Sequence, residues 1–156
     1  MAVQAKSKKK ISVVFVCTAN VCRSPVAEYL FKAELKKARK ASKFRVFSAG
    51  VSAYDGFPMS RLSAIVLKEA HIPFGAHKSR YLSDKMIQST DFIICMTEGH
   101  KRALFGPPNA YALGEITGGG DCADPYGGTR DDYQRMFDQL HDAMPEILAF
   151  IERNIV

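Results

Sequence analysis

One stretch near the N-terminus of the chain reads Cys17-Thr18-Ala19-Asn20-Val21-Cys22-Arg23-Ser24-Pro25. An apolar, β-branched run over residues 11–17 leads into it and a helical pattern over residues 24–40 follows it, so we expect a strand, a tight loop and a helix in that order. Such a loop curls backbone N–H groups around one point and aims the helix N-terminus at it, and both features favour an anion. The planar guanidinium of Arg23 matches two phosphate oxygens. The stretch therefore predicts a phosphoryl-binding site.

Cys17 would lie at the bottom of this loop and face the anion. The loop amides, the helix dipole and Arg23 all favour the thiolate, which is the nucleophilic form of cysteine. Ser24 supplies a hydroxyl that can hydrogen-bond the thiolate, and Pro25 in the first helical turn loses no hydrogen bond. A strand, turn and helix with a buried cysteine and a surface arginine is the simpler interpretation. The position of the pattern between strand and helix, together with its Arg-Ser-Pro ending, favours a catalytic loop.

Length and composition indicate one globular domain. The chain has 156 residues, of which 47% are hydrophobic and 24% charged, enough for one adequate core. No apolar run approaches the roughly 18 residues of a membrane span, so none is expected. Four scattered cysteines do not form a disulfide framework, which indicates a reducing cytoplasm. Cys17 and Cys22 lack the spacing of a zinc pair, and we expect neither a metal nor an organic cofactor.

The net charge of +6 comes largely from a lysine-rich start and from the end of the first predicted helix. Residues 1–10 are expected to form a flexible basic tail, without the apolar core of a secretory signal. Export by a route that needs no signal peptide is left open. Since no aromatic residues interleave the basic ones, a solvated tail and helix face explain the charge, and we predict no nucleic-acid partner.

The rest of the chain alternates short apolar strands with helices. Residues 114–128, rich in glycine and acidic groups, are expected to form a long loop, and Pro145 should kink or split the last helix. The alternation predicts a single α/β domain over residues 11–156, with a central parallel four-stranded sheet and helices on both faces. Ligands bind such sheets at the carboxyl ends of the strands, where the Cys17 loop lies. The further strands are expected at residues 43–48, 92–95 and 111–113, and the further helices at 60–70, 83–88, 98–104 and 129–154.

A second element of chemistry is Asp124-Pro125-Tyr126, within the predicted loop. Transfer of phosphate from an aryl ester to a thiolate needs a proton for the leaving oxygen, and a carboxylic acid beside the loop can give it and later accept one from water. Asp-Pro alone is a common turn initiator. Asp121, Asp131 and Asp132 are weaker candidates for the acid, because caps and a charged first helical turn explain them equally well.

Together these motifs resemble the low-molecular-weight protein tyrosine phosphatase family of bacterial type, over most of residues 11–153. The family loop reads Cys-x-Gly-Asn-x-Cys-Arg-Ser-Pro, and its general acid lies in an Asp-Pro-aromatic loop before the final helix. The resemblance implies a phosphocysteine mechanism in which Cys17 attacks phosphorus, Arg23 binds the phosphoryl oxygens and Asp124 is the general acid and base. Ala19 departs from the family glycine, which tolerates positive φ, and would narrow the cradle or slow turnover. The expected phosphate-binding residues are Thr18, Ala19, Asn20, Val21, Cys22, Arg23 and Ser24.

The resemblance also assigns residues that brace the loop. Ser48-Ala49-Gly50 and His77-Lys78-Ser79-Arg80 match family segments, so Ser48 and His77 join Asn20 and Ser24 in holding the loop in a strained conformation. Resemblance further suggests a protective disulfide between Cys22 and Cys17. The alternative is that Cys22 merely packs in the loop.

For the substrate, Tyr126 and Tyr54 could form the walls of a slot deep enough for phosphotyrosine and too deep for phosphoserine. Some bacterial relatives act on phosphoarginine instead and tend to carry threonine where this chain has Val21, which favours phosphotyrosine. Phosphorylated proteins are then the partners and inorganic phosphate the product, while the oligomeric state stays open. Two other classes of protein are alternatives. An arsenate reductase would need a resolving pair that Cys95 and Cys122 do not provide, and only Ala19 favours a non-catalytic phosphate-binding module.

Overall fold

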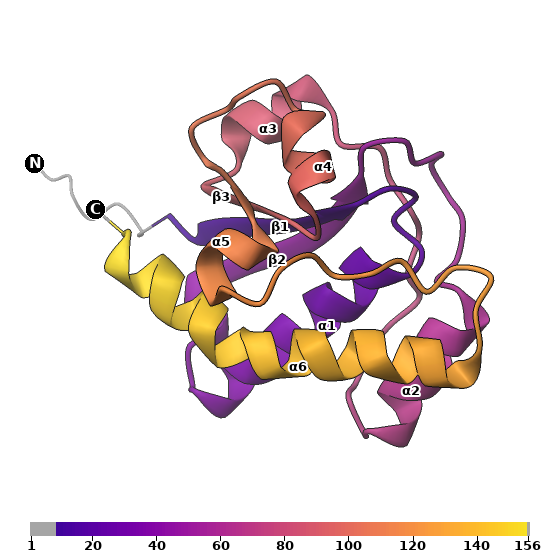
Figure 1. The fold of residues 1–156 in the computed structure, drawn as a ribbon. Helices are drawn as coiled ribbons and strands as arrows, with labels where there is room; N and C mark the ends of the chain where they lie inside the picture. The colour runs from indigo at the N-terminus through magenta and orange to yellow at the C-terminus, as the bar shows by residue number, and fades with distance from the viewer. Residues whose placement is uncertain (1–8, 156) are drawn as a thin grey trace, which may run out of the picture.

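The computed structural model describes residues 9–155. Most of the predicted basic tail therefore lies outside the described residues, and so does residue 156. Figure 1 shows a layered α/β arrangement in which the start of the first strand and the end of the last helix lie at one end of the molecule. Among residues 9–155, no helix is both long and apolar enough to cross a membrane.

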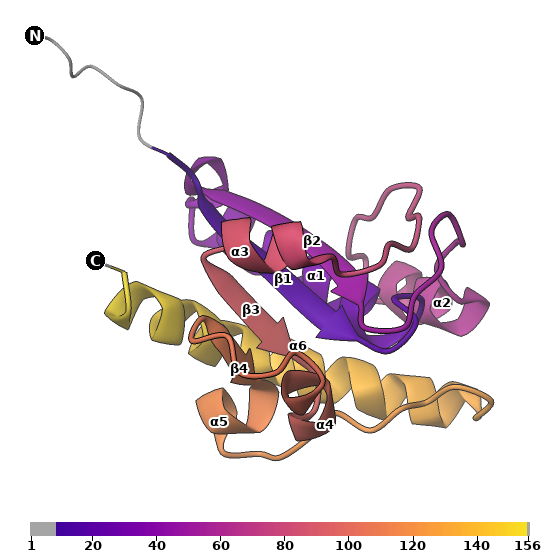
Figure 2. The same ribbon diagram turned by 90° about the horizontal axis from the view of Figure 1, so that it is seen from above.

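The sheet has four parallel strands in the order β2-β1-β3-β4, as Figure 2 shows from above. This confirms the predicted parallel four-stranded sheet. The third strand has the predicted bounds, whereas the second runs on through Ala49 and Gly50 because Gly50 still pairs with Cys17. The strands are β1 (Ile11–Cys17), β2 (Phe44–Gly50), β3 (Phe92–Cys95) and β4 (Ala110–Ala112).

Helices cover both faces of the sheet, as predicted. In Figure 1, α1, α2 and α6 lie on one face and α3 and α4 on the other. Side chains of β1 alternate between these two layers. Val13 and Phe15 belong to the core that contains α1 and α6, while Val14 and Val16 belong to the smaller core on the opposite face. All of these side chains are fully buried, as a central parallel strand requires. The helices are α1 (Arg23–Lys37), α2 (Arg61–Glu69), α3 (Asp84–Ser89), α4 (Glu98–Arg102), α5 (Leu113–Thr117) and α6 (Arg130–Arg153), with a 3-10 turn at Ala41–Lys43.

One sequence expectation needs correction, and one pair of alternatives, a kink or a split at Pro145, is decided in favour of the kink. The predicted loop over residues 114–128 contains most of a helix, α5, which is followed by Gly118 as its cap. Gly118 is in the left-handed conformation with φ of 74°, a common helix stop. This helix is too short to show a periodic pattern. Helix α6 is not split at Pro145 but continues through it, and its C-terminal third turns away from the direction of the rest in Figure 1. A proline bends a helix in this way because it lacks an N–H donor and crowds the preceding turn.

The strand order places the candidate site. The chain leaves β1 toward β2 on one side, and later returns to pair β3 on the other side of β1. In open parallel sheets, ligands bind at the carboxyl ends of strands where the order switches in this way. The loop after β1 and the loop after β3 therefore meet at the same edge of the sheet, where backbone hydrogen bonds join Met96 N–H to the Val16 carbonyl and Cys122 N–H to the Met96 carbonyl.

Candidate active site

The loop between β1 and α1 owes its shape to Asn20. This residue has a φ of 61°, a left-handed conformation that asparagine tolerates better than most residues. Ala19 is not among the positive-φ residues of the described chain. Its methyl group therefore adds no backbone strain, although it does line the cavity of the loop. The substitution of alanine for the family glycine changes the lining of the site and leaves the backbone path unstrained.

Three hydrogen bonds hold Asn20 in place. Its Nδ2 donates to Ser24 Oγ at 2.8 Å, its Oδ1 accepts from the backbone N–H of Arg80 at 2.9 Å, and its carbonyl lies 2.7 Å from His77 Nε2. Asn20 is completely buried, so each of these bonds replaces one that water would otherwise make. The His77 segment thus lies against the loop asparagine, where the sequence predicted it.

Ser24 links this network to Cys17. The Ser24 hydroxyl accepts from Asn20, and it lies 3.0 Å from Cys17 Sγ and 3.4 Å from the carbonyl of Ala49. A serine hydroxyl has one proton to donate. When Cys17 is a thiolate, donation to sulfur is the stronger bond, because bonds to a charged acceptor are about twice as strong as neutral ones. Ser24 is therefore placed to hydrogen-bond the thiolate.

The Ser48 segment meets the loop differently from the prediction. The Ser48 hydroxyl donates to Glu28 Oε1 of α1 at 2.7 Å, so this side chain braces the helix rather than the loop. The loop contact comes from Gly50, because a Cβ at that position would lie 2.4 Å from the Thr18 carbonyl oxygen and 3.0 Å from the Asn20 nitrogen. Gly50 lies in a segment that was matched to the family by sequence, but no role was predicted for it. Its place at the end of a strand was the available signal.

Arg23 is 5% exposed, and its guanidinium is held more closely on one side than on the other. Nη1 donates to the Cys122 carbonyl at 3.0 Å, whereas Nη2 makes longer contacts, 3.4 Å to Thr18 Oγ1 and 3.5 Å to Asp124 Oδ2. Nε is buried without a hydrogen-bond partner among residues 9–155. Because an unmet buried donor costs about 1–3 kcal/mol, the Nε and Nη2 edge is the one suited to a bidentate oxyanion.

Asp124 reaches the Cys17 loop from the segment between α5 and α6. Its Oδ1 accepts the backbone N–H of Tyr126 at 3.1 Å, a local turn across Pro125 that orients the carboxylate. Its Oδ2 lies 3.5 Å from Arg23, and half of the side chain stays exposed. The structure therefore brings Asp124 to the Cys17 loop, with one oxygen turned toward the guanidinium.

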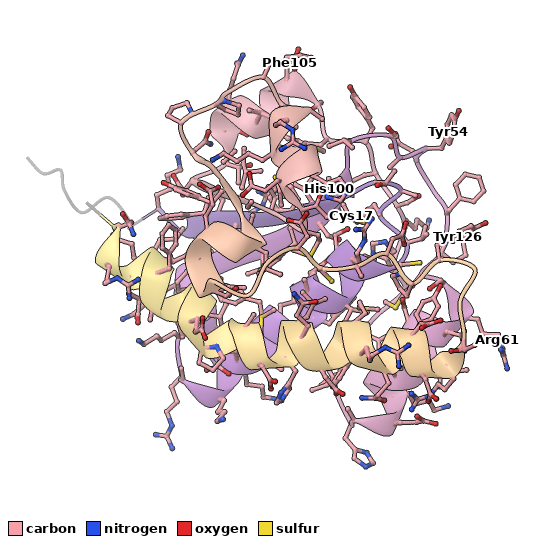
Figure 3. The ribbon with its side chains drawn as sticks, in the orientation of Figure 1. Cys17, Tyr54, Arg61, His100, Phe105 and Tyr126 are labelled. Carbon is pink, nitrogen blue, oxygen red and sulfur yellow. The ribbon has the colours of Figure 1, made fainter. Side chains whose placement is uncertain are left out.

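These groups surround one cavity. Tyr126 lines it although 76% of its surface is exposed, whereas Tyr54 is 80% exposed and is not part of the lining. In Figure 3, Tyr54 and Tyr126 lie at the same edge of the molecule, with Tyr54 projecting outward. The structure thus brings only one of the two predicted walls to the cavity. The lining consists of Cys17, Thr18, Ala19, Val21, Cys22, Arg23, Asp124 and Tyr126.

The other cysteines differ in their surroundings. Cys22 Sγ lies 3.4 Å from the hydroxyl of Tyr133, and the predicted disulfide with Cys17 stays a prediction. Cys95 and Cys122 are fully buried, and this burial raises the pKa of each thiol to about 12. A thiol of such high pKa is a poor nucleophile at neutral pH. No cluster of three or more metal-ligating side chains occurs within the described residues.

Sequence reasoning also missed His100, which belongs to α4. It is buried, with 7% of its surface exposed, and its Nε2 lies 2.9 Å from Thr18 Oγ1 in the Cys17 loop. Burial and, next, the charge of Arg23 lower its pKa to about 4, so the imidazole is neutral at neutral pH. The signal in the sequence was a threonine followed three positions later by histidine, directly after a buried strand.

Comparison with known proteins supports the resemblance. The family described as "Low molecular weight phosphotyrosine protein phosphatase" matches residues 12–156. The protein-arginine-phosphatase of Bacillus subtilis is 33% identical over 151 residues, which cover 92% of this chain and 99% of that protein. The low molecular weight protein-tyrosine-phosphatase PtpB of Staphylococcus haemolyticus is 37% identical over 133 residues, covering 82% of this chain and 91% of that protein.

A solved structure extends the similarity to three dimensions. It is a cysteine-to-serine mutant of the YwlE arginine phosphatase with a phosphorylated active site serine, at a TM-score of 0.85 and 32% identity, covering 92% of this chain and 97% of that one. Because the family matches almost from end to end and these relatives align over most of their length, this chain belongs to the low molecular weight phosphotyrosine protein phosphatase family of hydrolases.

Proposed function

We propose that this chain hydrolyses phosphotyrosine in proteins through a phosphocysteine intermediate at Cys17. The observation that carries the proposal is the arrangement around one cavity of the Cys17 thiol, the partly unpartnered guanidinium edge of Arg23 and the carboxylate of Asp124. A nucleophile, an oxyanion clamp and a proton donor are the groups that a phosphoryl transfer to sulfur requires.

In the first step, Cys17 Sγ attacks phosphorus, and the bond from phosphorus to the phenolic oxygen breaks. Asp124 gives its proton to that oxygen, and tyrosine leaves neutral. Arg23 and the amides of the loop hold the equatorial phosphoryl oxygens while charge redistributes. The hydroxyl of Ser24, 3.0 Å from the sulfur, stabilises the thiolate before attack and after release.

In the second step, the Asp124 carboxylate accepts a proton from water as that water attacks phosphorus. The bond from sulfur to phosphorus breaks, inorganic phosphate leaves and the Cys17 thiolate is restored. The same residue thus serves as acid and then as base. The YwlE mutant with a phosphorylated active site serine supports a covalent intermediate on the corresponding side chain.

The walls of the cavity favour an aryl group. Val21 and Tyr126 both line it, and the apolar Val21 side chain suits a phenol ring better than a charged guanidinium. The second candidate is phosphoarginine, because relatives of similar identity are named protein-arginine-phosphatases. Val21 offers no hydroxyl to that substrate, so phosphotyrosine is the proposed substrate.

Arsenate reduction is the weakest alternative. It needs thiols that can attack a disulfide, and the burial that raises the pKa of Cys95 and Cys122 to about 12 opposes this role. Phosphorylated proteins are the proposed partners. The proposed compartment is the cytoplasm, because a nucleophilic thiolate persists best where thiols are kept reduced.

The test is phosphate release from three peptides that carry phosphotyrosine, phosphoserine or phosphoarginine within the same flanking sequence, with Cys17→Ser as the blank. We expect strong preference for phosphotyrosine and no release by the blank, whose fold is checked by thermal melting. Preference for phosphoarginine would keep the mechanism and replace the substrate. Release by the Cys17→Ser variant at the wild-type rate would refute the covalent mechanism.

A further inference from the structure

His100 is bonded through both ring nitrogens, and both partners are threonines. Its Nε2 lies 2.9 Å from Thr18 Oγ1, a residue 82 positions away in the chain, and its Nδ1 lies 2.9 Å from Thr97 Oγ1. In Figure 3, His100 extends from α4 toward the loop that carries Cys17. A buried imidazole between two hydroxyls, one of them in the Cys17 loop, links the loop after β3 to the loop after β1.

The proton inventory of this link indicates one tautomer. Thr97 Oγ1 already accepts the backbone N–H of His100 at 3.0 Å, as the N-cap of α4. It can then donate its own proton to Nδ1, which leaves the imidazole proton on Nε2 for donation to Thr18. With the proton on Nδ1 instead, Thr97 Oγ1 would accept two hydrogen bonds and its own hydroxyl proton would have no acceptor in this link. Thr97 is the less exposed threonine of the two. With the proton on Nε2, the hydroxyl without an acceptor is that of Thr18, which is exposed and lines the cavity. Leaving this hydroxyl unpaired costs less free energy than leaving that of Thr97 unpaired.

This assignment decides what Thr18 can do. Its Oγ1 also receives Arg23 Nη2 at 3.4 Å. A hydroxyl oxygen has two acceptor lone pairs and one donor. With both lone pairs turned toward His100 and Arg23, the remaining O–H points away from them. An oxyanion in the cavity that Thr18 lines is an acceptor for it.

We propose that His100 is a positioning residue of the phosphate site: its Nε2–H fixes the Thr18 hydroxyl so that this hydroxyl donates a hydrogen bond to the bound phosphoryl group. The inference rests on the proposed function, because it assumes that the cavity binds phosphoryl groups. The Thr18 hydroxyl would then be a neutral donor to the phosphoryl group, in addition to the Arg23 guanidinium and the loop amides. His100 of α4, which follows β3, sets the direction of that hydroxyl.

The test is a double-mutant cycle on binding of inorganic phosphate, measured by calorimetry. The variants are Thr18→Val, which keeps the shape and loses the hydroxyl, His100→Leu, and both together. A hydrogen bond to a charged acceptor predicts that Thr18→Val weakens phosphate affinity by about ten-fold or more. If His100 acts through Thr18, the double variant is no weaker than Thr18→Val alone. Losses that multiply would overturn the proposal.

Two further measurements separate positioning from mere structural support. His100→Gln places an amide N–H near the position of Nε2 and should recover most of the affinity lost in His100→Leu, while Thr90→Val, which removes a hydroxyl bonded to the Met86 carbonyl at 2.6 Å, should affect stability alone. The nitrogen-15 chemical shifts of the His100 ring report the tautomer directly, without any substitution. A proton on Nδ1 in the wild type would overturn the proposal. Because these readouts need no turnover, failure of the hydrolysis test remains a separate result.

Discussion

The carbonyl of Cys122 accepts a hydrogen bond from Arg23 Nη1 at 3.0 Å, across 99 positions of sequence. This bond ties the loop that carries Asp124 to the guanidinium of Arg23 beside the Cys17 loop, and the residue that accepts it, Cys122, is fully buried. It also leaves the Nε and Nη2 edge of Arg23 for an oxyanion. Two loops that are distant in sequence thus share one anchoring point at the edge of the sheet.

Replacing Asp124 should affect substrates according to their leaving groups. Asp124→Asn removes the proposed proton donor, so hydrolysis of phenyl phosphate should slow by about 100- to 10,000-fold, while 2,4-dinitrophenyl phosphate, whose leaving group needs no proton, should lose far less. Steady-state kinetics on both esters measure this. The matched control is Asp131→Asn at the start of α6, which should behave as the wild type. Equal losses on the two esters would remove Asp124 from the acid role.

Gly50→Ala should displace the Cys17 loop. The added Cβ would lie 2.4 Å from the Thr18 carbonyl oxygen and 2.9 Å from the Ala53 Cβ, closer than atoms approach, so we expect a loss of about 1–3 kcal/mol in the free energy of unfolding and a weaker affinity for phosphate. Urea denaturation and phosphate titration measure the two effects. Gly75→Ala is the control, because nothing lies within 4 Å of its added Cβ. A Gly50→Ala variant with normal affinity would contradict the contact.

Val21→Thr should move substrate preference toward phosphoarginine. The variant introduces a hydroxyl into the wall of the cavity at nearly constant volume, and one added hydrogen bond of about 1 kcal/mol corresponds to about a five-fold change in the ratio of kcat/KM values. Competition between phosphotyrosine and phosphoarginine peptides reports the ratio. Val21→Ala, which loses apolar surface without gaining a hydroxyl, should weaken phosphotyrosine hydrolysis and leave phosphoarginine hydrolysis little changed. An unchanged ratio in Val21→Thr would show that this wall does not select the substrate.

Stability should fall as the pH drops below about 6.5, and His100 should account for part of the fall. Burial, and then the charge of Arg23, lower the pKa of His100 from 6.5 to about 4, against the opposite effects of Asp124 and Asp121. Between these values the unfolded chain binds a proton that the folded chain does not, so the free energy of unfolding rises with pH there. The shift corresponds to a contribution on the order of 3 kcal/mol, which is present above pH 6.5 and lost as the pH falls toward 4.

The measurement compares urea denaturation at pH 7 and pH 4.5 for the wild type and for His100→Gln. The variant should lose less stability between the two pH values, because it has no imidazole to protonate. His141→Gln, at an exposed position of α6, should keep the wild-type difference. If the wild type and His100→Gln lose the same stability, His100 does not carry this pH dependence.

Much of the fold could be predicted from local pattern. The strand at Ile11–Cys17 and the helix that follows the Cys17 loop were predicted, because an apolar run, a tight loop and helical periodicity are properties of adjacent residues. The first helix ends earlier than predicted, at Lys37, where Arg39 takes a φ of 59°. The short helix α5 was not predicted, because a single helical turn that contains a glycine is too short to show a helical pattern of apolar residues.

The chain by itself determined the chemistry of the site. Cys17, Arg23 and Asp124 are side chains whose types and spacing can be read directly, and the sequence predicted that they would meet. Only the tertiary structure decided how they are held. The Cys122 carbonyl is a backbone group with no sequence signature, and Ser48 pairs with Glu28 rather than with the loop. His100 reaches Thr18 because β3 pairs with β1, and strand order, which sets such contacts, is a property of the whole packed chain.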